Sequence, residues 1–98
     1  MSDAAAILPD GACPRLLSGV RVKHDGVRGT WVLLAPERTL KLDAIGHAIL
    51  SEVDGETPFA EIVERLAEKY DAPADRIAGD ARSYLVSLIE RRMAEART

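Results

Sequence analysis

Candidate catalytic and metal-binding side chains are few in this sequence and lie far apart along it. His24 and His47 have no second histidine or cysteine at the short spacing of a metal site, so both are interpreted as solvated surface residues. The single cysteine, Cys13, cannot form an internal disulfide, and nothing beside it marks it as a nucleophile. The acidic residues of segment 61–75 alternate with basic ones at helical spacing, which is typical of a solvated helix. The sequence therefore predicts a protein that is not an enzyme and that needs no metal or cofactor.

Composition and charge argue against two further classes of function, nucleic-acid binding and membrane insertion. The 98 residues are 47% hydrophobic and 30% charged, as expected for one globular domain. A net charge of −3 argues against nucleic-acid binding, which normally uses a basic excess, and four aromatic residues are too few for a base-stacking surface. No apolar run is long enough to span a membrane, and the N-terminus lacks a basic signal region. We therefore expect a cytoplasmic protein without membrane contact.

The first half of the chain contains three predicted strands. Residues 1–19 are rich in proline and glycine and are predicted to form an irregular N-terminal arm. Residues 20–24, 30–34 and 38–42 are apolar or alternating and are joined by short turns, which predicts an antiparallel meander. So small a sheet needs a cover on one face.

Three predicted helices supply that cover. The first spans 43–53 with Asp43 as its N-cap, the second spans 57–70 with Thr57 as its cap, and the third spans about 74–92. The apolar faces of the first two comprise Ile45, Ala48, Ile49 and Val53, and then Phe59, Ile62, Val63, Leu66, Ala67 and Tyr70.

The expected fold class is α+β, a winged-helix-like arrangement in which a three-stranded antiparallel sheet is followed by three helices. Residues 20–94 are expected to form this one domain.

The third helix has an unusually wide apolar arc. The stripe that would close the core comprises Ile77, Ala81, Tyr84, Leu85 and Leu88. A second flank contains Val86, Ile89 and Met93, next to Arg82. This flank either packs beneath the first or second helix or forms the wall of a groove for a partner, and the sequence leaves both alternatives open.

A winged-helix-like fold has two familiar uses. It can place its third helix in the major groove of DNA, but here acidic residues dilute the arginines of that helix. It can also bind a peptide as an added strand at an exposed sheet edge, and the alternating strand 38–42 is suited to that role.

The sequence also resembles the pyrroloquinoline quinone (PQQ) biosynthesis protein D family over residues 14–92. The most specific part is WVLLAPERTLKLD at 31–43. The remaining matches are Ile49-Leu50, Asp54-Gly55, Ile62-Val63 with Leu66, segment 70–73, Asp80, Tyr84-Leu85 and Leu88.

The resemblance implies a role as a stand-alone recognition domain for a ribosomal precursor peptide. Such a peptide chaperone binds the precursor (protein A) and presents it to a radical S-adenosylmethionine enzyme (protein E), which cross-links a Glu and a Tyr of the precursor. The clusters and cofactor of that reaction belong to the partner. The resemblance places the peptide-binding residues at Arg38, Thr39, Leu40, Lys41, Leu42, Arg82, Leu85, Val86 and Ile89.

Two other functions remain alternatives at this stage. One is a small winged-helix DNA-binding regulator, whose affinity would fall steeply with salt. The other is a subunit that only stabilises a larger enzyme and does not bind the isolated precursor.

Overall fold

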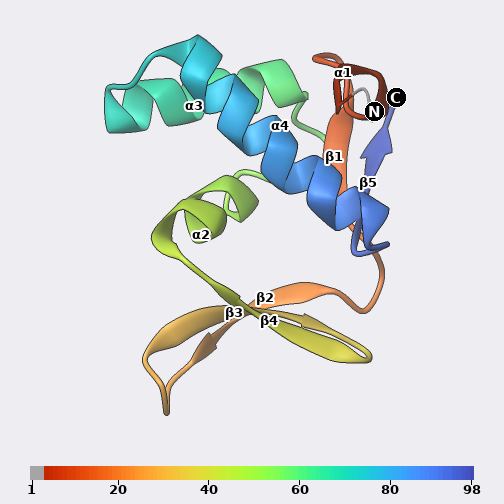
Figure 1. The fold of residues 1–98 in the computed structure, drawn as a ribbon, viewed down its shortest axis with the longest axis vertical. Coiled ribbons are helices and arrows are strands. Elements are labelled where there is room, and N and C mark those ends of the chain that lie inside the picture. Colours follow the sequence, from red (N-terminus) through yellow and green to blue (C-terminus); the bar gives the residue numbers. More distant parts are fainter. Residues whose placement is uncertain (1–3) are drawn as a thin grey trace.

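The computed structural model describes residues 4–98, with the helices stacked over a small twisted sheet (Figure 1). In chain order the elements are α1 (Ala4–Ile7), β1 (Cys13–Leu16), β2 (Arg21–Asp25), β3 (Thr30–Ala35), β4 (Arg38–Leu42), α2 (Ala44–Leu50), α3 (Phe59–Tyr70), α4 (Ala74–Glu90) and β5 (Ala94–Arg97). The predicted α+β class is confirmed, as is the three-stranded antiparallel meander.

The meander has the order β2-β3-β4, so β4 is an edge strand. Leu33 of β3 is opposite Leu40 of β4 and Val22 of β2, and Leu33 is fully buried. Because side chains alternate along a strand, these three residues share one face of the sheet. The helices of residues 4–98 all lie on one side of this sheet in Figure 1, and none of them covers its other face.

The two turns that flank α2 follow local sequence signals. The Asp43 carboxylate accepts a hydrogen bond from the Gly46 amide at 2.7 Å, which confirms Asp43 as the N-cap. The helix ends at Leu50, earlier than the predicted residue 53. Gly55 has a φ of +80°, a conformation that glycine adopts without strain.

The prediction of Thr57 as the cap of α3 is wrong. Asp54 forms its own local network, in which its carboxylate accepts from the Glu56 and Thr57 amides at 2.9 and 2.7 Å and from the Thr57 hydroxyl at 2.9 Å. The Thr57 hydroxyl is therefore occupied, and Pro58 holds the N-cap position without a side-chain cap.

The N-terminal segment provides what α3 lacks. The Phe59 amide donates to the Ala12 carbonyl at 2.8 Å, and the Ala60 amide donates to the Asp10 carbonyl at 3.0 Å. The first turn of α3 is thus capped by backbone far away in sequence.

The prediction of an irregular arm is wrong for much of residues 4–16. They form α1 and β1, and β1 pairs antiparallel with β5 from Cys13↔Arg97 to Leu16↔Ala94. Leu8 is fully buried. The prolines and glycines of this segment disfavour regular structure locally, and the prediction was based on them. The strand that pairs with β1 lies at the opposite end of the chain, where a local signal cannot show it.

The core is aliphatic apart from Phe59 and sits between the helices and the inner face of the sheet. Its fully buried large side chains include Leu8, Leu33, Phe59, Ile62 and Leu85. Burial of this surface is the main source of stability for so small a domain.

Candidate functional site

The free edge of β4 is the first component of the candidate site. Arg38, Thr39 and Lys41 are exposed along it, whereas Leu42 is buried. A two-residue turn joins β3 to β4, so the pair Ala35↔Arg38 next to it is of the hydrogen-bonded type. Alternation then directs the backbone N–H groups of Thr39 and Lys41 away from β3. The edge consequently offers donors and acceptors to another strand.

A hollow lies where β4 runs into α2, opposite α4. Lys41, Leu42, Asp43 and Tyr84 line this space of about 230 Å³. Gly46 leaves room for the side chain of Tyr84 from α4, because a Cβ at this position would lie 2.9 Å from the Tyr84 hydroxyl oxygen. Burial, and then the nearby Asp43 carboxylate, raise the pKa of Tyr84 above its ordinary value, so the ring presents a neutral hydroxyl.

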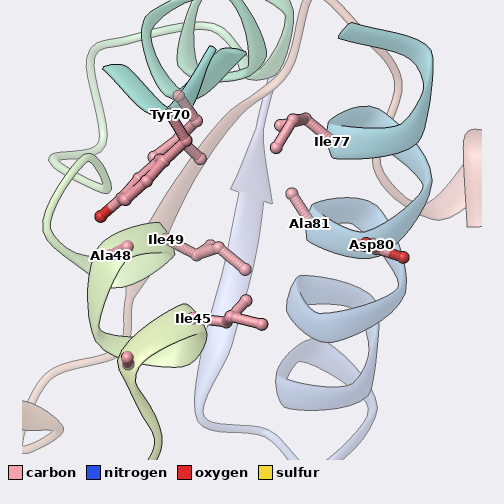
Figure 2. Close-up of a pocket in the computed structure, with 9 residues that line it drawn as sticks. Ile45, Ala48, Ile49, Tyr70, Ile77, Asp80 and Ala81 are labelled. Carbon is pink, nitrogen blue, oxygen red and sulfur yellow. The ribbon is translucent and has the colours of Figure 1, made fainter. Parts of the chain in front are cut away.

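A separate apolar cleft of about 250 Å³ lies between α2, α3 and α4 (Figure 2). It is lined by Ala44, Ile45, Ala48, Ile49, Leu66, Tyr70, Ile77, Asp80 and Ala81. Ile45 and Ile49 of α2 point toward Ile77 and Ala81 of α4 in Figure 2. Ile45 is 66% exposed and Tyr70 is 52% exposed, so both side chains add open surface to an otherwise apolar cleft.

The hollow and the cleft are neighbours. Asp43 lines the former and Ala44 the latter, while Tyr84 lies one helical turn beyond Ala81 on α4. We call the two together the β4–α4 groove. Its walls are the β4 edge with α2 on one side and the Ile77–Ala81–Tyr84 flank of α4 on the other.

The structure places the α4 residues predicted for peptide binding on a different flank. Leu85 is fully buried and Val86 is only 5% exposed, so neither side chain offers open surface to a ligand in this structure. Ile89 is half-buried and packs against the core. Helix α4 packs against α1, α3 and β5, so this flank lies partly beneath the N-terminal segment rather than beneath α2.

Arg82 holds that segment in place. Its Nε donates to the Leu8 carbonyl at 2.9 Å, its Nη2 forms an ion pair with Asp10, and its guanidinium lies 4.5 Å from the centre of the Phe59 ring. These contacts use the guanidinium for packing and capping. Arg82 therefore does not line the β4–α4 groove.

The sequence reasoning assigned Ile45 and Tyr70 to buried helix faces and Tyr84 to the core stripe. Their only signal in the sequence was a place on a predicted apolar helix face, and such a face can belong either to the core or to an open groove. Which of them remained exposed depended on how the helices pack together.

His24, His47 and Cys13, the candidate catalytic or metal-binding residues, each contact another part of the fold. His24 and His47 both pack on Trp31, with ring centroids 4.9 and 4.2 Å away, so neither is simply a solvated side chain. The thiol of Cys13 donates to the Glu56 carbonyl at 3.4 Å. Within residues 4–98 there is no cluster of three or more potential metal ligands, and no helix in this range is long and apolar enough to cross a membrane.

This chain is similar to known proteins in both sequence and structure. The profile of the family described as coenzyme PQQ synthesis protein D (PqqD) matches residues 30–94. A PqqA binding protein of Rhizobium meliloti is 42% identical over 95 residues, covering 97% of each chain. A PqqA binding protein of Xanthomonas campestris pv. campestris is 42% identical over 82 residues, covering 84% of this chain and 89% of the relative.

Two solved structures are also similar. One is the solution NMR structure of the PqqD truncation of Methylobacterium extorquens PqqCD, described as a functional, stand-alone recognition element for ribosomally synthesized and post-translationally modified peptides. It is 38% identical, with a TM-score of 0.77, covering 96% of this chain and 99% of that one. The crystal structure of PqqD from Xanthomonas campestris is 41% identical, with a TM-score of 0.55, covering 82% and 89%. With matched residues, length and fold in agreement, the chain belongs to the coenzyme PQQ synthesis protein D family.

Proposed function

We propose that this chain is a peptide chaperone of PQQ biosynthesis. In this role it binds the ribosomal precursor peptide PqqA and presents it to the radical S-adenosylmethionine enzyme of the pathway (protein E) for Glu–Tyr cross-linking. Family membership and the names of the relatives, which are PqqA binding proteins, support the peptide as ligand. The observation that carries the proposal is the outer edge of β4, with which no strand of residues 4–98 pairs, next to an exposed apolar groove.

The geometry suits an extended peptide. A peptide strand beside β4 would pair with the outward N–H groups of Thr39 and Lys41. Its alternate side chains would turn toward Leu42 and Tyr84, and an apolar side chain beyond the end of β4 could enter the cleft near Ile45. Backbone pairing would then supply affinity, and the groove would supply selectivity.

The predicted contacts are accordingly revised in one part only. Arg38, Thr39, Leu40, Lys41 and Leu42 remain the proposed strand contacts. On α4, the flank with Ile77, Ala81 and Tyr84 replaces the flank with Arg82, Leu85, Val86 and Ile89 as the proposed wall, because the latter carries little open surface.

Titration of the labelled protein with the precursor peptide, followed by amide shift mapping, tests this function. We expect the largest shifts at 39–45 and 77–84. Ile45→Ala should weaken binding while changing the free energy of unfolding by less than about 1 kcal/mol, since the side chain is mostly exposed. The matched control is Val27→Ala, in a turn remote from the groove, where the side chain is 97% exposed.

Equal loss of binding in the Ile45 and Val27 variants, or shifts confined to other surfaces, would contradict the proposed site. A protein that binds protein E but not the isolated precursor would instead be only a stabilising subunit.

A further inference from the structure

The outward face of the three-stranded sheet is basic, and no helix in the described part of the chain covers it (Figure 1). Trp31 stacks on His47 of α2, which identifies the helix-facing side of β3, so Thr30, Val32 and Leu34 point the other way. The residues paired with Val32 and Leu34 are Lys23, Arg21, Lys41 and Thr39, and their side chains share this outward face. We call the set Arg21, Lys23, Val32, Leu34, Thr39 and Lys41 the outer sheet face.

Charge is unevenly divided along the chain. Segment 20–42 contains five basic and two acidic residues, for a net charge of +3. The rest of the chain contains the other eight basic and fourteen acidic residues, for a net charge of −6. An acidic protein thus concentrates positive charge on its exposed sheet, and such a patch attracts acidic surfaces over about one Debye length.

The basic side chains of this face are available to a partner. Among residues 4–98, Arg21, Lys23 and Lys41 have no salt-bridge partner, whereas Arg15, Arg65 and Arg82 are paired. The acidic residue at the margin, Asp25, is engaged locally, because it accepts from the Val27 and Arg28 amides at 3.1 and 3.2 Å. The centre of the face is the apolar pair Val32 and Leu34, both partly buried.

We propose that the outer sheet face docks an acidic surface of the enzyme to which the bound peptide is delivered. This inference rests on the proposed function. It follows from position: β4 contributes its edge to the peptide groove and its outward side chains to the basic face. An enzyme docked on the outer face would therefore have the peptide at the rim of its contact, while the helices stay clear.

An acidic protein fits the surface better than a nucleic acid does. A winged-helix contact with DNA uses the wing and the third helix together. Here α4 has part of its surface packed by α1, α3 and β5, and it exposes Asp75, Asp80 and Glu90. Those carboxylates would repel phosphate, whereas a protein surface can match the +3 sheet and avoid the acidic helices.

The test uses the double variant Arg21→Glu/Lys23→Glu, which changes β2 and leaves the β4–α4 groove intact. The control is Arg76→Glu/Arg97→Glu, which makes the same change in net charge at exposed sites outside the three-stranded sheet. Affinities for the precursor peptide, for protein E and for a 20-base-pair DNA duplex (a length of about two helical turns) are measured separately. We expect the sheet variant to bind protein E at least about tenfold more weakly than the control, with peptide affinity unchanged in both.

Salt provides a second measurement that needs no variant. Raising the salt concentration from about 0.05 M to about 0.5 M should weaken binding of protein E to the unaltered protein. Equal affinity of both variants for protein E, or no response to salt, would overturn the inference. So would a DNA affinity that falls only in the sheet variant. If the unaltered protein did not bind the precursor peptide, that result would instead contradict the proposed function.

Discussion

The contact of Gly46 with Tyr84 determines the shape of the groove at the scale of single residues. The ring of Tyr84 occupies the space that a side chain at position 46 would need, and a Cβ there would also come within 3.2 Å of the capping Asp43 carboxylate. The ring of Tyr84 can therefore keep its place against the N-terminus of α2 only with glycine at this point.

Gly46→Ala should consequently lower the free energy of unfolding by about 1–3 kcal/mol and weaken peptide binding, because Tyr84 must move. Gly79→Ala in α4 is the control, since a Cβ there meets nothing within 4 Å. It should raise stability by up to about 1 kcal/mol through helix propensity. Thermal melts compare the two, and a neutral Gly46→Ala would contradict the close-packed arrangement.

Asp54 provides a residue-scale prediction about pH. Hydrogen bonds from the Glu56 and Thr57 amides, and then from the Thr57 hydroxyl, hold the pKa of its carboxyl group below the ordinary value of 3.8. The stabilisation is complete above that value and is lost as the pH falls through the lowered pKa of the folded state.

Asp54→Asn keeps an oxygen that can accept hydrogen bonds but replaces the ionisable carboxyl group with an amide that does not titrate. Melting temperatures from about pH 5 to about pH 2 should therefore fall more steeply for the unaltered protein than for the variant. Parallel curves would show that Asp54 does not contribute to acid unfolding.

At the scale of elements, the β4 edge makes a prediction about proline. The N–H groups of Thr39 and Lys41 point away from β3, so proline at either position removes a donor that the sheet does not use. Thr39→Pro and Lys41→Pro should each weaken peptide binding while the helical circular dichroism signal stays. Leu40→Pro, which removes a donor to β3, should destabilise the sheet itself. Peptide affinity that is unaffected by both edge prolines would mean that the ligand does not pair with β4.

At the scale of the whole molecule, the two ends of the chain complete the domain together. β1 pairs with β5, an ion pair of 2.5 Å joins Arg15 to Glu95, and the segment before β1 caps α3. Residues 4–98 thus form two small sheets at different sites, and the sequence predicted only the three-stranded meander (Figure 1).

Removal of residues 1–12 should therefore destabilise the entire domain. The truncation deletes the buried Leu8 and the carbonyl groups that accept from Phe59 and Ala60. Leu8→Ala is the smaller change and should cost about 2–5 kcal/mol in the free energy of unfolding. Denaturant melts and hydrogen exchange at the α3 amides measure both. A truncated chain as stable as the full one would restore the hypothesis of an irregular arm.

The sequence by itself determined the strands of the meander, the three main helices and the Asp43 cap. Each follows from a signal that spans a few residues: alternation in 38–42, an N-cap before an apolar run, a glycine or proline at a turn. Such signals act locally, so they survive in the folded protein. The family resemblance likewise rested on contiguous stretches, above all 31–43.

Only the tertiary structure decided which flank of α4 is open and what the terminal segments do. Arg82 and Val86 form as plausible a groove wall as Tyr84 when α4 is considered alone. One flank of α4 is covered by β5 and by the N-terminal segment that Arg82 holds, so the other flank remains open. The strands β1 and β5 pair across almost the full length of the chain. Such long-range contacts leave little trace in local pattern, because burial depends on which distant element reaches a surface.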